Sequence, residues 1–232
     1  MRAKKYTEIL MAVLLLVVVY VCSAKAGMLA SGSDNEISFV VVIDAGHGGK
    51  DPGKVSKNGV YEKDINLNIA NSLKDMLESQ GVTVIMTREN DEGLYEETDS
   101  NKKMSDMIKR CEIINSCDAD LVVSIHQNSY PSESVKGAQA FYYETSESGR
   151  SAAGYIQESM IEILDKENGR KAKSNSGYYI LLNSQSPAVI VECGFMSNPV
   201  EVALLCDKDY QRKIAWSIHM GIMKYINGEK LM

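Results

Sequence analysis

The sequence lacks several features that mark particular classes of protein. Beyond residue 26 it has no Lys/Arg cluster large enough to follow a phosphate backbone, which argues against a nucleic-acid partner. It has no Cys-x-x-Cys pair, which argues against a zinc site built from thiolates. It also has no internal repeat, low-complexity tract or proline-rich linker. With 232 residues, 44% of them apolar, the chain suits one globular domain.

Cysteine is scarce, and its positions favour free thiols over disulfides. Cys22 lies in an N-terminal apolar run, which leaves four cysteines in the rest of the chain. Cys111 and Cys117 lie in or just after a helical apolar pattern, and Cys193 ends an apolar strand pattern. We therefore predict that these residues, with Cys206, are buried free thiols.

The apolar run near the N-terminus is shorter than an ordinary membrane-spanning helix. It covers 14 residues, Ile9 to Cys22, against the roughly 20 that a spanning helix needs. Basic residues precede it, and Ala24-Lys25-Ala26 supplies the small residues of a cleavage site. We predict that residues 1–26 are an export signal, either cleaved so that the protein begins near Gly27 or retained as an anchor that contacts the membrane. A short linker at 27–36 and a folded domain at 37–228 follow.

Short β-branched runs alternate with helical patterns along the remaining chain, which is typical of an α/β domain. Apolar residues at helical spacing predict helices whose Met and Ile stripes form core rather than a cofactor site. The predicted helices cover about Glu62–Gln80, Met104–Ile114, Ser148–Leu164 and Asp209–Ile226. The predicted strands are Ile37–Ile43, Val82–Thr87, Leu121–Ile125, Ala138–Tyr143, Tyr178–Leu182 and Ala188–Cys193.

The glycine-rich loop Asp44–Gly53 invites comparison with a phosphate-binding loop. That motif requires Ser or Thr after its Lys, whereas Val55 follows Lys54 here, and no helical pattern begins at once. The glycines are better explained as letting the backbone pack tightly around His47.

Polar side chains occur where predicted strands end. His47 follows the first strand, His126 follows the strand ending at Ile125, and Glu192 lies at the end of an apolar run. Ligands bind at the carboxyl edge of open α/β sheets, so these residues can converge there, and Glu62 can join them from the start of its helix. Two imidazoles and a carboxylate form the His₂Glu set of catalytic zinc sites.

Each of these residues has an ordinary explanation when it is taken alone. A single histidine is usually structural, as we expect for His219, and a glutamate at a helix start is often there for the helix dipole. Glu192 is more informative, because it interrupts the apolar Ala-Val-Ile-Val stretch. A buried carboxylate needs an ion-pair partner, a metal or a catalytic task, and beside a zinc-bound water it can act as the general base.

Five segments carry a resemblance to a known enzyme family. They are Val42–Gly49, Glu62–Leu67, Thr87-Arg88, Ala119–Asn128 and Val191–Asn198. Through them the chain resembles the zinc-dependent N-acetylmuramoyl-L-alanine amidases, catalytic domain type 3, over nearly all of residues 38–227. The resemblance implies a twisted sheet of about six strands, mostly parallel and flanked by helices, which agrees with the number of predicted strands.

The resemblance also implies roles for individual residues. The positions of His47, Glu62 and His126 hold one zinc ion in that family, and the position of Glu192 is catalytic. The implied reaction is hydrolysis of the amide between the lactyl group of N-acetylmuramic acid and L-alanine in peptidoglycan. Asn128 is a candidate substrate contact, although an Asn there can equally close the loop. The alternatives are a zinc peptidase acting within the stem peptide and a catalytically silent wall-binding protein.

The short exported form is similar to the sporulation-associated, germination-specific amidases of spore formers, which prepare spore cortex for muramic-lactam formation. This resemblance implies a location in the cell wall or in the forespore intermembrane space. Loss of residues 1–26 would remove four positive charges and one negative, moving the net charge from -6 to -9. An acidic domain facing an often anionic wall, without a wall-binding repeat, predicts a protein partner for recruitment or activation.

Overall fold

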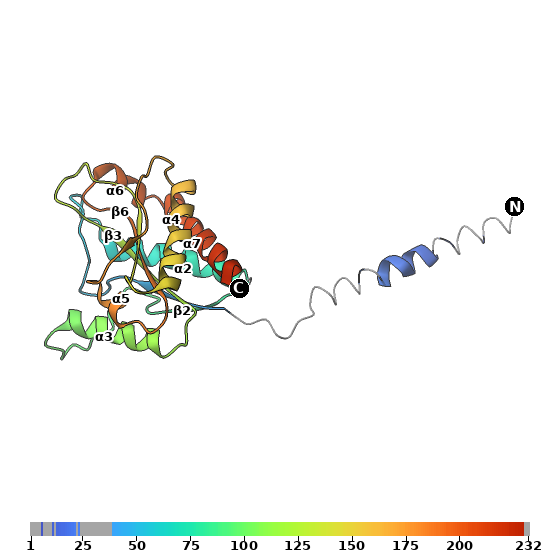
Figure 1. The fold of residues 1–232 in the computed structure, drawn as a ribbon, viewed down its shortest axis with the longest axis horizontal. Coiled ribbons are helices and arrows are strands. Elements are labelled where there is room, and N and C mark those ends of the chain that lie inside the picture. Colours follow the sequence, from blue (N-terminus) through green and yellow to red (C-terminus); the bar gives the residue numbers. More distant parts are fainter. Residues whose placement is uncertain (1–5, 7–10, 12, 22, 24–38, 230–232) are drawn as a thin grey trace. The chain divides into compact units, whose positions relative to one another are not determined.

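The computed structural model describes residues 6, 11, 13–21, 23 and 39–229, drawn as the coloured ribbon in Figure 1. They fall in two compact units, Met1–Ile37 and Ser38–Met232. In the first unit, residues 13–21 are helical. No helix among the described residues is both long and apolar enough to cross a membrane. The predicted cleavage motif Ala24–Ala26 and the linker at 27–36 lie outside the described residues.

The second unit is an α/β domain built on a six-stranded sheet in its described part. The sheet order is β2-β1-β3-β6-β4-β5, and every neighbouring pair is parallel except the antiparallel pair β4 and β6. This confirms the predicted mostly parallel sheet. The strands are β1 (Val40–Ala45), β2 (Thr83–Met86), β3 (Leu121–Asn128), β4 (Gln139–Tyr142), β5 (Lys173–Ser174) and β6 (Ala188–Phe195).

Helices cover both faces of this sheet. In Figure 1, α2, α4 and α7 lie together on one side, and α3 and α5 lie on the other. The helices are α2 (Glu62–Glu78), α3 (Lys102–Asn115), α4 (Glu147–Ile163), α5 (Tyr179–Asn183), α6 (Pro199–Leu205) and α7 (Lys208–Glu229).

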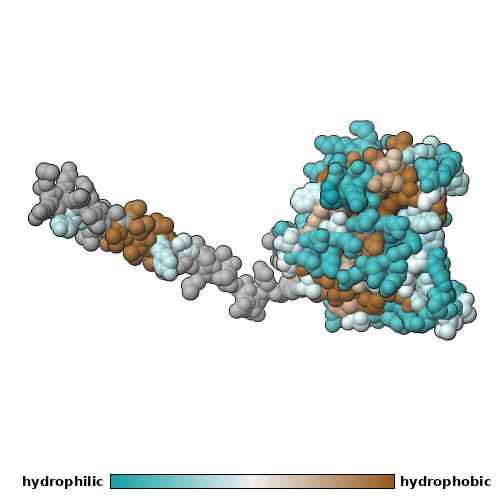
Figure 2. Space-filling model, turned by 180° about the vertical axis from the view of Figure 1, so that it is seen from behind, coloured by the Kyte–Doolittle hydropathy of each residue, from teal (hydrophilic) through white to brown (hydrophobic). Residues whose placement is uncertain are grey.

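Alternate residues of the central strands pack into two separate hydrophobic cores. Val41 and Ile43 of β1 pack with α2, α4 and α7, whereas Val42 between them packs with α3 and α5. A strand buried on both faces reads as a continuous apolar run, which explains the sequence pattern. On the face drawn in Figure 2, hydrophilic residues cover most of this unit and hydrophobic ones form smaller groups between them.

One predicted strand is wrong. Residues 178–182 fall mostly in helix α5, and the sixth strand is the two-residue β5 instead. Backbone bonds from Leu182 N to Tyr178 O and from Ser184 N to Ile180 O close helical turns. The segment is a short apolar run, whose length and composition do not distinguish a buried strand from one or two buried helical turns.

The cysteines agree with the prediction in part. All four that the structure describes in the second unit are free. Cys111 and Cys193 are buried as expected, whereas Cys117 is partly exposed and Cys206 is exposed. Cys206 lies at the C-terminal end of the short helix α6, which the sequence patterns did not identify.

Candidate active site

His47 lies two residues beyond β1 in a strained backbone conformation. Its φ is 64°, in the left-handed region that non-glycine residues rarely adopt. Such strain persists where the surroundings over-determine the geometry, and it gathers at functional sites. Here the guanidinium of Arg110 donates to the His47 carbonyl at 2.6 Å, and the His47 side chain reaches Asp51.

The neighbouring glycines leave room for the rings, as the sequence predicted. A Cβ at Gly46 would come within 2.3 Å of the His126 ring. A Cβ at Gly53, where φ is +68°, would come within 2.6 Å of both Glu62 Oε2 and the His47 ring. The glycines therefore let the loop backbone close onto the two histidines and Glu62.

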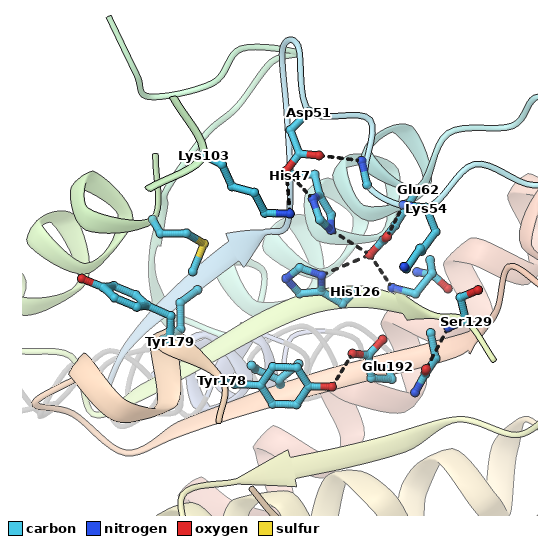
Figure 3. A pocket seen from close by; sticks show the side chains of 16 residues that line it. His47, Asp51, Lys54, Glu62, Lys103, His126, Ser129, Tyr178, Tyr179 and Glu192 are labelled. Atoms are coloured by element: carbon cyan, nitrogen blue, oxygen red, sulfur yellow. Dashed lines mark hydrogen bonds and ion pairs between the residues drawn. The ribbon is translucent and has the colours of Figure 1, made fainter. Parts of the chain in front are cut away.

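His47, Glu62 and His126 converge from a loop, a helix start and a strand. Their side chains point toward one another in Figure 3, and their donor atoms all lie within 4.8 Å of one another. Glu62 Oε1 lies 3.3 Å from His47 Nε2 and 3.1 Å from His126 Nδ1. Among the described residues this is the one group of three or more side chains placed to hold a metal. The predicted convergence is present.

Backbone groups fix the carboxylate of Glu62. Gln127 N donates to Oε1 at 2.9 Å, and Lys54 N donates to Oε2 at 2.7 Å. Burial alone would raise the pKa of Glu62, but the hydrogen bonds and positive charges of the two imidazoles hold it well below its usual value. Glu62 is therefore an ionised carboxylate that is held in a fixed orientation.

Asp51 orients His47 from the side away from the cluster. Its Oδ2 lies 2.8 Å from His47 Nδ1, which leaves Nε2 facing Glu62. Burial lowers the pKa of His47, but the hydrogen bonds to Asp51 and Glu62 outweigh it and raise this pKa to about 9. A carboxylate on the outer nitrogen is the usual arrangement behind a metal-binding histidine. The sequence patterns did not single out Asp51, because both residues lie in a loop, where a spacing of four residues does not predict a contact.

A buried polar network lies beneath this loop. Arg110 is 1% exposed and donates to Asp44 Oδ1 at 2.6 Å and to the Ala45 carbonyl at 2.8 Å. Arg88 donates to the carbonyls of Ala45 and Gly46. Because buried backbone carbonyls need partners, the two guanidinium groups hold the loop in the shape that presents His47.

Glu192 lies on β6 beside His126 on β3, where the two residues are register partners. Both strands extend further than predicted, so His126 lies within β3 rather than just after it, whereas Glu192 lies within its strand as the predicted bounds had it. Glu192 is 6% exposed, and Tyr178 donates a hydrogen bond to its Oε1 at 3.0 Å. Burial raises the pKa of Glu192, and the charge of Glu62 adds to that rise.

A cavity of about 410 Å³ joins these groups. The three clustered residues and Glu192 line one part of it, and apolar side chains such as Met107 and Ile180 line another. Asn128 also lines the cavity, while its Oδ1 accepts from Ser129 N within the loop. Asn128 therefore both borders the cavity and bonds to the residue that follows it. His219 is buried in α7 and stacks on Trp216, apart from the cluster.

Residues 41–224 match the family of N-acetylmuramoyl-L-alanine amidases. The chain belongs to this family. It is 41% identical over 189 residues to the germination-specific N-acetylmuramoyl-L-alanine amidase of Bacillus subtilis. The matched region covers 80% of this chain and 79% of that protein. Membership makes the chain a hydrolase of peptidoglycan amide bonds, as the resemblance implied.

Solved structures show the same fold. The CwlD amidase from Clostridioides difficile, solved in complex with the GerS lipoprotein, superposes with a TM-score of 0.79 at 41% identity, covering 82% of this chain and 98% of that chain. An N-acetylmuramoyl-L-alanine amidase from Clostridium difficile 630 superposes with a TM-score of 0.73 at 29% identity, covering 82% and 97%.

Proposed function

We propose that His47, Glu62 and His126 hold one zinc ion. The observation that carries this proposal is a single buried carboxylate oxygen facing one nitrogen of each of two imidazoles. The set has the His₂Glu composition of catalytic zinc sites, and Asp51 fixes the nitrogen that His47 presents. The cluster borders the cavity, so a water molecule or a substrate oxygen has access to it. The residues therefore fit the metal.

We infer that Glu192 is the general base. Zinc held by these three residues would act as a Lewis acid, which would make a water molecule more acidic and polarise a carbonyl group. Glu192 then takes the proton from the attacking water and passes it to the departing amine of L-alanine, so that the carboxylate is regenerated. Burial raises its pKa, which suits a group that must both accept and release a proton. The intact Glu192 argues against a silent wall-binding protein.

Product analysis separates the amidase from a zinc peptidase. Purified peptidoglycan is digested with the metal-loaded protein, and the soluble products are identified by mass spectrometry. An amidase releases peptides that begin with L-alanine and leaves the glycan strands whole. Peptides that begin at an internal stem residue would support a peptidase and contradict the proposal.

We propose that the physiological substrate is spore cortex peptidoglycan, where peptide removal precedes muramic-lactam formation. Support comes from the 41% identity to a germination-specific amidase. Deleting the gene in the source organism should give spores whose cortex lacks muramic lactam. A cortex with normal lactam content would contradict this role.

We also propose an exported protein with a partner outside the cytoplasm. The basic and apolar N-terminal residues support export. The complex of the C. difficile amidase with a lipoprotein supports a partner of this kind. N-terminal sequencing should give a start near Gly27, whereas Met1 or Arg2 on membrane-bound protein would favour an anchor. Full zinc occupancy and strong activity of the isolated protein would remove the need for a partner.

A further inference from the structure

Glu192 has two oxygens in different surroundings. Oε1 accepts the hydrogen bond of Tyr178 at 3.0 Å, whereas Oε2 is buried and has no hydrogen-bond partner among the described residues. In Figure 3 the Tyr178 hydroxyl points at the Glu192 carboxylate. One oxygen is therefore held, and the other is a buried acceptor whose hydrogen-bonding capacity is unused among the described residues.

The Tyr178 side chain is itself fixed from several directions. Asn175 Oδ1 accepts from Gly177 N and Tyr178 N, which shapes the turn before α5. The phenol ring meets Phe141 edge-on with 5.6 Å between ring centroids. Ile180, two residues later, is buried in the core against α3. A donor held in this way can orient its acceptor.

We propose that Tyr178 is a positioning residue for Glu192. Its hydroxyl holds Oε1 and so keeps Oε2 directed at the place where the attacking water loses its proton. This proposal rests on the proposed role of Glu192 as general base. A carboxylate without such a donor can rotate about its side-chain torsions, and misorientation of a catalytic group by even a small distance slows the reaction.

The phenol is suited to remain a donor throughout the reaction. Burial raises the pKa of Tyr178, and the nearby charge of Glu192 raises it further. The hydroxyl therefore stays protonated at neutral pH. No proton leaves Tyr178 in this account, and the proton from water resides on Glu192 until it reaches the leaving amine.

Tyr178→Phe removes the hydroxyl and keeps the ring against Phe141. The matched control is Tyr143→Phe, because Tyr143 packs against the same core but lines a different cavity. Both variants are tested as full chains loaded with zinc on purified peptidoglycan. We expect Tyr178→Phe to keep its zinc and its KM within about twofold while kcat falls roughly tenfold or more, the scale of a hydrogen bond to a charged group. Tyr143→Phe should match the wild type.

A double-mutant cycle with Glu192→Gln separates positioning from structural support. With enzyme in excess over substrate, Tyr178→Phe should slow the wild type but add little to Glu192→Gln, because no base is left to orient. An equal slowing in both backgrounds, or unchanged kcat in Tyr178→Phe, would overturn the proposal. Wild-type activity in Glu192→Gln would instead refute the proposed general base, which keeps the two failures distinct.

Discussion

Glu62 and Glu192 are both buried carboxylates of the same cavity, yet their surroundings differ sharply. Glu62 accepts hydrogen bonds from two backbone amides and faces two imidazoles. These imidazoles lower its pKa against the effect of burial. Glu192 lies in an apolar strand with Tyr178 as its hydrogen-bond donor, and burial raises its pKa.

The difference fits the two tasks that we propose for these residues of the same type. When the surroundings shift the pKa values of two carboxylates in opposite directions, the group with the lowered pKa stays charged. The group with the raised pKa is suited to exchange a proton. Glu62 begins α2, where the helix dipole also favours negative charge. Glu192 has no such support, which agrees with the proposed roles of Glu192 in proton transfer and of Glu62 in metal binding.

Removing an imidazole should give the largest effect. We expect His47→Ala and His126→Ala to lose bound zinc and to retain less than about 1% of peptide release, because the chelate loses one of three protein donors. Metal analysis and peptide-release rates test this. The control His219→Gln, in α7, should keep its zinc. Full zinc occupancy in either alanine variant would contradict the proposal that the metal is bound at Glu62 and its two histidines rather than at Glu192.

Asp44 adds a third buried carboxylate, whose charge is paired permanently. Arg110 Nη1 lies 2.6 Å from Asp44 Oδ1. Burial alone would raise the pKa of Asp44, but Arg110 and the hydroxyl of Ser124 outweigh it and lower this pKa to about 2. Asp44→Asn should therefore reduce the free energy of unfolding at pH 7 by about 3–5 kcal/mol, the cost of leaving a buried partner charge unpaired. Denaturant unfolding measures this.

The same pair predicts how that difference depends on pH. A lowered folded-state pKa stabilises the fold fully above the ordinary value of 3.8, and the contribution is lost as pH falls through about 2. The stability gap between wild type and Asp44→Asn should therefore shrink between about pH 4 and pH 2. A constant gap over that range would show that the charge of Asp44 does not contribute.

A smaller effect is expected behind His47. Asp51→Asn keeps the size of the side chain but removes the negative charge beside Nδ1, so zinc affinity should fall roughly 10- to 100-fold. Competition with a chromogenic chelator measures the affinity. Glu97→Gln, which alters only the ion pairs of an exposed carboxylate with Lys50 and Lys102, is the control. Unchanged affinity in Asp51→Asn would mean that Glu62 alone orients the cluster.

Local patterns in the sequence were enough for five of the six strands, the main helices and the convergence of His47, Glu62, His126 and Glu192. They were enough because strand ends of a mostly parallel sheet meet at one edge. The pattern of Tyr178–Leu182 was ambiguous between strand and helix, and tertiary packing decided it. The pairing of Asp44 with Arg110 joins residues 66 apart, and that of Tyr178 with Glu192 crosses between elements, so neither has a local signal.

The most direct test compares Glu62→Gln with Glu192→Gln, since both remove one charge and keep the side-chain size. Zinc content and peptide-release rates are measured on both variants under the same conditions. We predict that Glu62→Gln loses zinc and activity together, while Glu192→Gln keeps its zinc and slows by roughly 10²-fold or more. Loss of zinc from Glu192→Gln, or near wild-type turnover by it, would contradict the division of tasks between the two carboxylates.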